Sequence, residues 1–342
     1  MIAGVYRGVM DVRGEEVEVP SAGPAEIVVR VRACGLCGTD VSKIRFGLVH
    51  PPAVLGHEVA GDVVRVGEGV HAIAEGDRVV VGHHVPCGDC LACVAGYESQ
   101  CPEFLHNNLD PGGFAEYVNV LPRSAMRATF RIPDGLGYEE ASQAESVGCA
   151  LRALERMKLE AGAAALVVGA GTVGLLHVQL LRHMGAGFIA VSDPLDWRRE
   201  VAESLGADVA FDPAAVDLPV SMAEATRGRR LAIIVVAAGS PLAVEHALSC
   251  CGVGTQVLVF AECAPGSRVA LDPSTLYRKE LSVVGGYSTT PEHIRRGLGL
   301  IEDGTVAVAP LVTHRFGLAG ISEAVELAVN PRDGSLKIII EP

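Results

Sequence analysis

Four cysteines lie close together in one short segment of the chain. Their spacing is C-x2-C-x2-C-x7-C, with a proline before the first and after the last: Cys87, Cys90, Cys93 and Cys101. Four thiolates at this spacing can surround one zinc ion in a closed tetrahedron, with Zn–S distances of about 2.3 Å. A closed shell has no position for a substrate, so the segment predicts a structural zinc. An iron–sulfur cluster is the alternative for a similar spacing.

A second set of potential ligands lies nearer the N-terminus. CGTD contains Cys37 and Asp40, and GHE contains His57 and Glu58. A catalytic zinc takes three protein ligands and keeps one position open, and such an ion lowers the pKa of water or of an alcohol. These residue types therefore fit metal-assisted chemistry, although a lone histidine beside glycine is more often structural.

A glycine-rich segment follows a strongly apolar run. Residues 165–176, ALVVGAGTVGLL, contain G-x-G-x-x-G at Gly169, Gly171 and Gly174. Between a strand and a helix, these glycines permit a tight turn, close approach of the backbone to a pyrophosphate, and close helix–strand packing. The helix would begin at Thr172 and Val173, and a helix N-terminus favours an anion. The segment predicts a dinucleotide site.

An acidic residue ends the next predicted strand. Asp193 follows FIAVS and lies 22 residues beyond Gly171 (193 − 171), where a carboxylate accepts hydrogen bonds from the adenosine ribose. A 2′-phosphate at this position would meet a like charge, so we predict NAD as the cofactor. Arg198 and Arg199 keep NADP as the alternative; otherwise they only solvate a helix face.

The ordered motifs resemble those of the zinc-containing medium-chain dehydrogenases, and most closely the polyol and threonine dehydrogenase branch. They are CGTD, GHE, the four-cysteine segment, GGFAEY, VVGAGTVG and YRKELSVVGGY, and they extend over essentially the whole chain. The resemblance implies a GroES-like, β-rich catalytic domain over 1–146 and 286–342 and a Rossmann domain over 147–285. It also implies two zinc ions per chain, an active site in the interdomain cleft, and a homodimer or homotetramer.

The resemblance assigns Cys37, His57 and Glu145 to the catalytic zinc, with Glu58 as a carboxylate that can enter or leave the shell. Glu145 lies in QAESVG, where the family has proline after the glutamate and this chain has a serine. Cys149, one helical turn later, is the rival ligand.

The same resemblance assigns Thr39 the first hydroxyl of a proton relay. The family often has histidine three residues later, but this chain has Ser42. Either Ser42 relays the proton through water, or the proton leaves through the nicotinamide ribose to another group. Asp40 would orient His57, and Arg198 would contact the adenosine ribose.

The elements that must position these residues differ along the chain. Up to about residue 146, short alternating strands separated by Gly and Pro predict an antiparallel or barrel-like β unit. Over 147–285, apolar runs alternate with helical segments, which predicts a doubly wound parallel sheet. The last stretch, 286–342, mixes two helices with VTHRF and a closing strand, LKIIIEP. We therefore predict an α/β protein with a separate β-rich domain.

Several other residues have structural interpretations. His83 and His84, just before the four-cysteine segment, fit exposed or strand-capping histidines better than metal ligands. Glu116 in GGFAEY should organise the site or an interface. The remaining cysteines are expected to be packed in the core: Cys34, Cys250, Cys251 and Cys263.

Composition limits the function classes. The 342 residues exceed one hydrophobic core, and 49% apolar with 20% charged residues excludes wholesale disorder. A net charge of −13 argues against nucleic acid and anionic membranes as partners. The apolar runs are too short for a membrane span, and the N-terminus lacks the layout of a signal peptide. A cytoplasmic enzyme acting on small molecules is expected.

The predicted reaction is the reversible oxidation of a secondary alcohol to a ketone with NAD. A polyol, a sugar derivative or a hydroxy-amino compound is the expected substrate, and the low aromatic content of 4% mildly favours a polar one. A primary-alcohol dehydrogenase or a biosynthetic ketone reductase is the alternative on the same scaffold. A non-catalytic protein that binds zinc or a dinucleotide is the alternative from another class, but it would have no need for an open zinc site.

Overall fold

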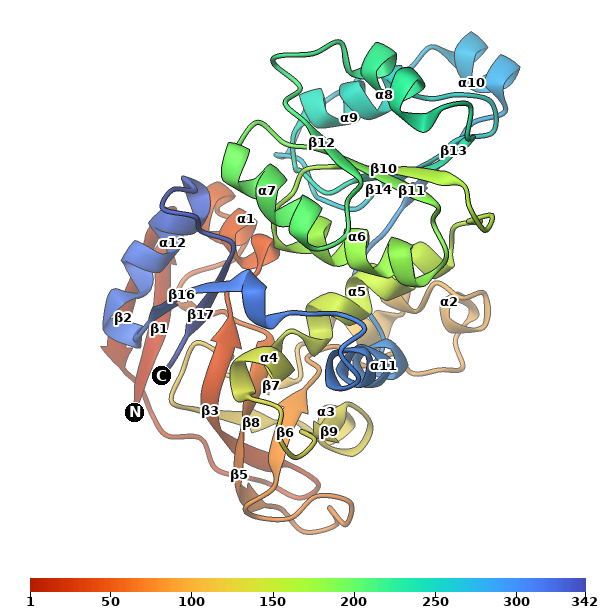
Figure 1. The fold of residues 1–342 in the computed structure, drawn as a ribbon. Coiled ribbons are helices and arrows are strands. Elements are labelled where there is room, and N and C mark those ends of the chain that lie inside the picture. The colour runs from red at the N-terminus through yellow and green to blue at the C-terminus, as the bar shows by residue number, and fades with distance from the viewer. The chain divides into compact units, whose positions relative to one another are not determined.

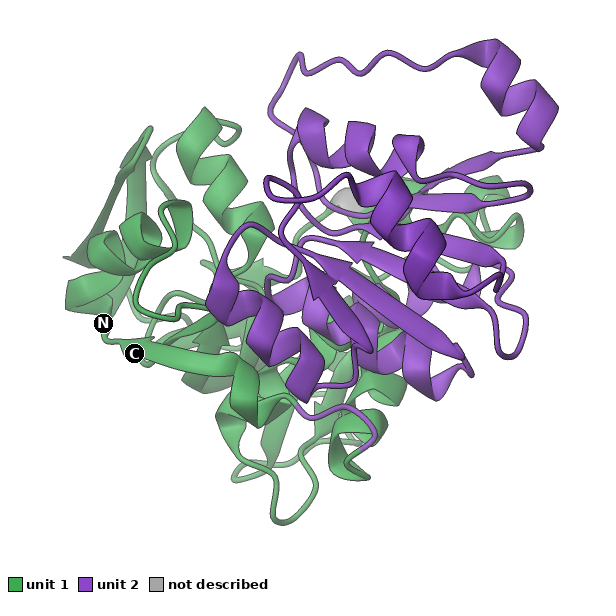
Figure 2. Ribbon diagram, turned by 45° about the horizontal axis from the view of Figure 1, so that its top comes forward, with its two compact units in different colours: residues 1–148, 288–304, 308–342 green, residues 149–287, 305–307 purple. Residues whose placement is uncertain are grey.

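The computed structural model describes residues 1–342, except for the side chain of Leu105. The chain divides into two compact units, which are coloured separately in Figure 2. Unit 1 comprises residues 1–148, 288–304 and 308–342, and unit 2 comprises residues 149–287 and 305–307. Unit 1 is therefore built from both ends of the chain. Within the described chain, every helix is too short or too polar to cross a membrane.

Unit 1 contains two sheets (Figure 1). The smaller has the strand order β2-β1-β4, and the larger has the order β16-β17-β3-β5-β6-β9, with β8 paired to β3 and β7 to β8. The strands are β1 (Ile2–Gly8), β2 (Asp11–Glu16), β3 (Ile27–Gly35), β4 (Ala53–Val54), β5 (Glu58–Val66), β6 (Arg78–Val81), β7 (Leu109–Asp110), β8 (Tyr117–Val120), β9 (Thr129–Arg131), β16 (Val312–Phe316) and β17 (Lys337–Ile340).

Helices connect and cover these strands. They are α1 (Gly38–Phe46), α2 (Leu91–Val94), α3 (Pro122–Arg127), α4 (Tyr138–Ser142), α5 (Ala144–Glu155), α11 (Pro291–Glu302) and α12 (Ile321–Val329), with short 3-10 turns at η1 (Glu98–Gln100), η2 (Pro102–Leu105), η3 (Ala309–Leu311) and η4 (Leu318–Gly320). Helix α5 continues from unit 1 into unit 2.

The core of unit 1 lies under the larger sheet. Val29 and Val31 of β3 pack there with Val63 of β5 and Ile338 of β17, all at most 2% exposed. Antiparallel pairing of β17 with β3 sets Ile339 opposite Gly35. The C-terminal strand therefore lies beside the end of β3, immediately before the segment that carries the predicted metal ligands.

Unit 2 is a parallel sheet with the strand order β12-β11-β10-β13-β14-β15. Its strands are β10 (Ala164–Val168), β11 (Phe188–Ser192), β12 (Val209–Phe211), β13 (Leu231–Val236), β14 (Gln256–Val259) and β15 (Ser282–Gly285), and its helices are α6 (Thr172–His183), α7 (Asp196–Ser204), α8 (Leu218–Thr226), α9 (Pro241–Ser249) and α10 (Pro273–Lys279). Figure 1 shows α6 and α7 on one face and α8 and α9 on the other. All of β10 is buried, as expected for a strand covered on both faces.

The order of the strands reverses beside β10. The chain moves from β10 through β11 to β12 on one side, and then crosses to β13 on the other side of β10. A crevice at the carboxyl ends of the strands forms where the order reverses, and this is where open α/β sheets bind ligands. The glycine-rich segment begins at the carboxyl end of β10, so it lies at this point.

A buried histidine in unit 2 makes its stability depend on pH. His177 of α6 is fully buried, contacts Phe260 edge-on and donates from Nδ1 to the Val173 carbonyl at 2.7 Å. Burial lowers the pKa of His177 to about 4, although the hydrogen bond to Val173 opposes the shift. The unfolded chain binds this proton below about pH 6.5 and the folded chain only near pH 4, so stability falls as the pH drops through this window.

Because of this protonation, the free energy of unfolding should be about 2 kcal/mol lower at pH 5 than at pH 7. We expect His177→Leu to reduce the loss of unfolding free energy between pH 7 and pH 5 by about that amount, measured by urea denaturation. The exposed His183 on the same helix supplies the control, His183→Gln, which should keep the wild-type pH dependence. Equal pH slopes for His177→Leu and the wild type would contradict the prediction.

Candidate metal centres and cofactor site

The four-cysteine segment forms a compact cluster of sulfur atoms. Cys90 Sγ lies 3.5 Å from Cys93 Sγ, Cys87 Sγ lies 3.5 Å from Cys101 Sγ, and Cys87 Sγ lies 3.9 Å from Cys93 Sγ. A tetrahedron with Zn–S bonds of about 2.3 Å has edges of about 3.8 Å. Sulfur atoms that ligate a multi-iron cluster lie farther apart, because several atoms separate them. The observed distances therefore fit a single ion.

Backbone N–H groups stabilise the thiolates of this cluster. Cys87 N–H points at Cys101 Sγ at 3.3 Å, Gly88 N–H at Cys93 Sγ at 3.4 Å, and Cys90 N–H at Cys87 Sγ at 3.4 Å. Hydrogen bonds to a charged form favour it, so these contacts support three of the four thiolates that a zinc ion requires. All ten cysteines of the chain are free of disulfide bonds.

The second centre begins where β3 ends. Cys37 is the N-cap of α1, and its backbone N–H donates to Asp40 Oδ2 at 3.3 Å. The other carboxylate oxygen, Oδ1, accepts from Gly56 N–H at 3.4 Å and lies 3.2 Å from His57 Nδ1. Asp40, which is 1% exposed, therefore ties the start of α1 to the segment before β5.

Asp40 also determines how His57 can bind a metal. Burial raises the pKa of Asp40, but the charge and hydrogen bond of His57 outweigh burial, and the net shift is downward. Against an ionised carboxylate, Nδ1 of His57 must be the donor, which leaves the lone pair on Nε2 for a metal. Burial lowers the pKa of His57, but the charges of Asp40 and Cys37 raise it well above its ordinary value. The site therefore attracts a cation.

Glu58 lies at the start of β5 and has no exposed surface. Its oxygens accept from Lys337 Nζ at 2.8 and 2.6 Å, and Oε1 also accepts from Ser146 Oγ at 2.6 Å. Gly35, opposite Glu58 in the sheet, leaves room for this arrangement, because a Cβ there would lie 1.8 Å from Oε2. Burial lowers the pKa of Lys337, but Glu58 and Cys37 raise it above its ordinary value, so the ammonium stays charged beside Glu58.

The potential ligands of this second centre form two overlapping groups. Ligand atoms of Cys37, His57 and Glu58 lie within 4.8 Å of one another, and so do those of His57, His83 and Glu145. Glu145, at the start of α5, is 6% exposed. The donor types and separations fit zinc, which thiolate, imidazole and carboxylate ligands hold in a tetrahedral shell.

The other residues expected near this centre lie at different depths. Thr39 is exposed and Ser42 is half-buried, both on α1. Cys149 belongs to unit 2 and to none of the groups of potential metal ligands among the described residues. Cys34 is fully buried in the core, as expected. Glu116 accepts a hydrogen bond from Ile2 N–H at 2.7 Å, so it organises the first strand.

The glycine-rich turn joins β10 to α6 as predicted. Gly171 is the N-cap of α6, and Thr172 and Val173 form its first turn. A Cβ on Gly174 would lie 1.9 Å from the Gly169 carbonyl oxygen, so the helix can start this close to the strand only with glycine at that position. The N–H groups at this helix N-terminus are free to face an anion.

Asp193 follows β11 beside this turn and is 2% exposed. Its Oδ2 accepts from Ala170 N–H at 2.8 Å and its Oδ1 from Leu195 N–H at 2.9 Å. Arg198 Nη1 lies 3.7 Å from Asp193 Oδ2, and burial lowers the pKa of Arg198 despite this carboxylate. Both residues therefore border the turn, a carboxylate and a guanidinium side by side.

Comparison with known proteins matches each part of the chain. Residues 23–134 match the alcohol dehydrogenase GroES-like domain, and residues 172–303 match the zinc-binding dehydrogenase domain. Sorbitol dehydrogenase of Bacillus subtilis is 30% identical over 100% of this chain and 97% of its own. L-threonine 3-dehydrogenase of Pyrococcus abyssi is 32% identical over 95% of this chain and 94% of its own.

The chain belongs to the zinc-containing medium-chain dehydrogenases. It falls in their polyol and threonine dehydrogenase branch and is an oxidoreductase of the zinc alcohol dehydrogenase family. A zinc-binding dehydrogenase of Sinorhizobium meliloti 1021, solved with NADP, has the same fold, with a TM-score of 0.89 and 29% identity over 100% of this chain and 99% of that one. The predicted fold class, a GroES-like domain with a Rossmann domain, is confirmed.

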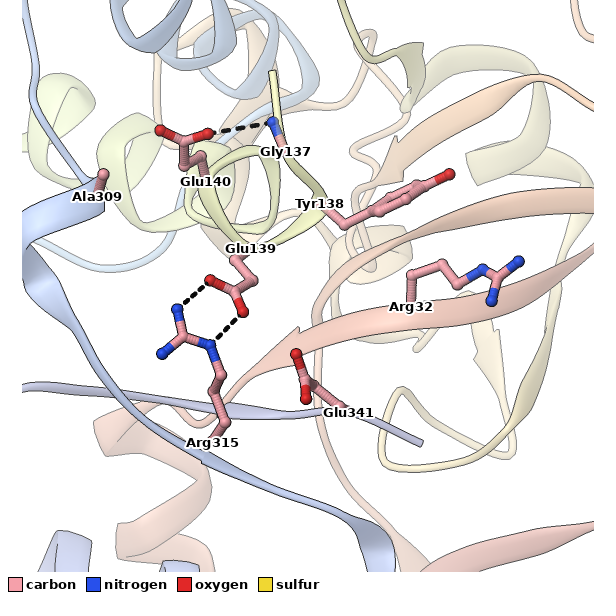
Figure 3. Close-up of a pocket in the computed structure, with 8 residues that line it drawn as sticks. All are labelled: Arg32, Gly137, Tyr138, Glu139, Glu140, Ala309, Arg315 and Glu341. Carbon is pink, nitrogen blue, oxygen red and sulfur yellow. Dashed lines mark hydrogen bonds and ion pairs between the residues drawn. The ribbon is translucent and has the colours of Figure 1, made fainter. Parts of the chain in front are cut away.

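The dehydrogenase also has an open polar pocket of about 370 Å³ in unit 1, whose lining includes none of the potential metal ligands (Figure 3). Two of its lining side chains pair with each other, since Arg315 Nε and Nη2 donate to Glu139 at 2.5 and 2.6 Å, whereas Arg32 pairs at 2.6 Å with Asp62, which is outside the lining.

The sequence interpretation missed three features of this dehydrogenase. It expected an exposed or capping role for His83, whereas the structure places this ring 4.5 Å from that of His57. It gave no role to Lys337, the only charged residue of β17, whose position in an otherwise apolar strand could have indicated a buried partner. It noted that Ser146 replaces a proline, but not that the hydroxyl reaches Glu58.

Proposed function

We propose that this dehydrogenase reversibly oxidises a secondary alcohol to a ketone and transfers the hydride to NAD. A polyol, a sugar derivative or a hydroxy-amino compound is the proposed substrate, as the likeness to a sorbitol and a threonine 3-dehydrogenase supports. The observation that carries the proposal is that His57, oriented by a buried carboxylate, belongs in unit 1 both to a group of potential ligands with Cys37 and Glu58 and to one with His83 and Glu145.

Different residues of the chain would have different roles at the catalytic zinc. When bound, zinc would act as a Lewis acid that lowers the pKa of the substrate alcohol. Cys37, His57 and Glu145 would hold the ion, and their two negative charges would neutralise it. Asp40 keeps the His57 ring oriented through the 3.2 Å contact to Nδ1. We propose Thr39 and Ser42 on α1 as the start of the path by which the alcohol proton reaches solvent.

Asp193 supports NAD as the cofactor. Its buried carboxylate borders the glycine-rich turn, where it would meet a 2′-phosphate with a like charge. NADP is the second candidate, because Arg198 lies beside Asp193, has a buried Nε with no hydrogen-bond partner among the described residues, and could pair with that phosphate. The relative solved with NADP supports keeping this candidate.

The experiment that tests the proposal measures metal, cofactor and substrate together. Protein purified without a metal-chelating tag is analysed for zinc per chain and assayed with NAD and NADP against polyols, threonine and primary alcohols. Two zinc ions per chain and NADH formation on a secondary alcohol support the proposal. Turnover confined to primary alcohols favours the alternative dehydrogenase. One zinc ion and no turnover on any alcohol or ketone would favour a non-catalytic protein.

Asp193→Ala should shift the cofactor preference toward NADP. Removing a like charge near the 2′-phosphate is expected to raise the ratio of kcat/KM for NADP to that for NAD by about tenfold to a hundredfold. Initial rates with both cofactors measure the ratio. Asp196→Ala is the control, because this residue lies at the start of α7 with a largely exposed side chain. If the ratio stayed constant in Asp193→Ala, Asp193 would not select the cofactor.

We also propose that the enzyme is a homodimer or homotetramer. Strand β15 is the edge of the unit 2 sheet and pairs only with β14 among the described strands, and Val283 on it is 46% exposed. An open edge of this kind can pair with another chain. Light scattering coupled to gel filtration measures the molar mass of the assembly. A monomer at micromolar concentration would reject the proposed homo-oligomer.

A further inference from the structure

His83 lies just after β6, in a row of stacked rings. Its imidazole centroid is 4.5 Å from that of His57 and 3.8 Å from that of His84, and the His84 ring packs at a tilt against Phe104 with centroids 4.6 Å apart. The Nδ1 atom of His83 is buried and has no hydrogen-bond partner among the described residues. A buried nitrogen without a partner costs about 1–3 kcal/mol, so native proteins usually satisfy it with water or an ion.

The neighbours of His83 indicate an ion. One ligand atom each from His57, His83 and Glu145 lies within 4.8 Å of the other two. His57 also belongs to the group with Cys37 and Glu58, so an ion bound by His57 would have members of both groups as neighbours. The two groups together contain five candidate donors, more than a tetrahedral shell accepts.

Glu58 is engaged by two other side chains. Lys337 contacts both of its oxygens at 2.8 and 2.6 Å, and Ser146 donates to Oε1 at 2.6 Å. Lys337 is 3% exposed, so a Glu58 that turned to the ion would leave a buried ammonium without its carboxylate. Breaking a buried ion pair costs about 3–5 kcal/mol. Glu58 is therefore held by the protein rather than available to the ion.

The balance of charge also favours His83 over Glu58 as the further ligand. Zinc with the Cys37 thiolate and the Glu145 carboxylate is neutral, and a neutral imidazole adds no charge. Glu58 as a further ligand would add a negative charge to a buried site, whereas beside Lys337 this charge is already compensated. A shell completed by His83 is therefore electrostatically more favourable than one completed by Glu58.

We propose that His83 is a fourth protein ligand of the catalytic metal, and that Lys337 and Ser146 hold Glu58 outside the shell. Zinc sites can expand to five ligands, so this set still admits a substrate. The proposal rests on the metal site of the proposed function but is independent of the identity of the substrate and of the cofactor.

The test counts imidazoles at the metal. The catalytic zinc is exchanged for Co²⁺ while the four-cysteine site keeps zinc, and X-ray absorption at the cobalt edge is recorded without substrate. We expect two imidazoles and one sulfur in the wild type, and one imidazole in His83→Gln. The matched control is His84→Gln, which removes the neighbouring ring of the stack and should leave two.

Metal affinity gives a second readout. Loss of partners that only support a ligand costs about 10- to 100-fold in affinity. Loss of a direct ligand in His83→Gln should therefore weaken Co²⁺ binding, measured by chelator competition, by at least about 100-fold, with His84→Gln near the wild type. The wild-type imidazole count stands even if His83→Gln fails to fold.

Two results would overturn the inference in different ways. A wild-type spectrum with one imidazole, or an unchanged spectrum in His83→Gln, rejects His83 as a ligand and leaves the proposed function intact. Failure of the wild type to bind Co²⁺ or zinc anywhere but the four-cysteine site rejects the catalytic metal, and with it both proposals.

Discussion

Replacing Lys337 by methionine should destabilise the protein by about 3–5 kcal/mol. Lys337 is 3% exposed and its partner Glu58 has no exposed surface, so the variant leaves a buried carboxylate without a counter-ion. Methionine has nearly the same length and apolar stem, which keeps the loss of packing small. Urea denaturation of the metal-loaded protein at pH 7 measures the unfolding free energy.

The double variant Lys337→Met/Glu58→Gln distinguishes the contribution of the ion pair to stability from the contribution of side-chain packing. With both charges removed, it should recover most of the stability lost in Lys337→Met, because a neutral amide costs less to bury than an unpaired carboxylate. Ser146 should still donate to the amide oxygen. A double variant no more stable than Lys337→Met would show that the stem of Lys337, rather than its charge, stabilises the protein.

Replacing Cys37 by serine should remove one of two zinc ions per chain and lower kcat/KM by about 10³-fold or more. The thiolate is the strongest zinc donor of the proposed set and contributes one of its two negative charges. Metal analysis and initial rates on the best secondary alcohol measure both effects. The four-cysteine cluster contains none of these ligands. It should therefore keep its zinc ion, and the segment around it should keep its stability.

Cys34→Ala is the matched control for this variant. Cys34 is three residues upstream, fully buried, and outside both groups of potential metal ligands in the described part of the chain. It should lose some stability through the small cavity but keep two zinc ions and most of the activity. Wild-type zinc content in Cys37→Ser would contradict the assignment of Cys37, whatever the activity.

Local sequence was sufficient where one segment contains the whole feature. The four cysteines lie within fifteen residues (87 to 101), so their spacing alone constrains their geometry, and the structure brings their sulfur atoms to 3.5–3.9 Å. The same holds for the glycine-rich turn, because β10, the turn and the start of α6 are continuous in the chain. The strand-like segments FIAVS, VTHRF and LKIIIEP likewise contain β11, β16 and β17.

Local sequence does not predict which donors of the second metal centre lie close together. Cys37, His57 and Glu145 come from three separate segments, and only their resemblance to a known family predicted that they meet. The residue types were informative, but nothing within a short window indicates which of them face one another, since that depends on how the strands of unit 1 pair.

What the sequence alone determined is therefore the fold class, the four-cysteine cluster and the glycine-rich turn, all of which depend on short-range spacing and periodicity. Only the tertiary structure decided that Lys337 pairs with Glu58, 279 residues away, that Ser146 joins them, and that His83 faces His57 and Glu145. The physical reason is that these contacts arise from the pairing of β17 with β3 and from the packing of α5 and the segment after β6 around the end of β3. The role of a buried charge or of an unpartnered nitrogen depends on its neighbours. Those neighbours are set by long-range strand pairing and cannot be inferred from the local sequence.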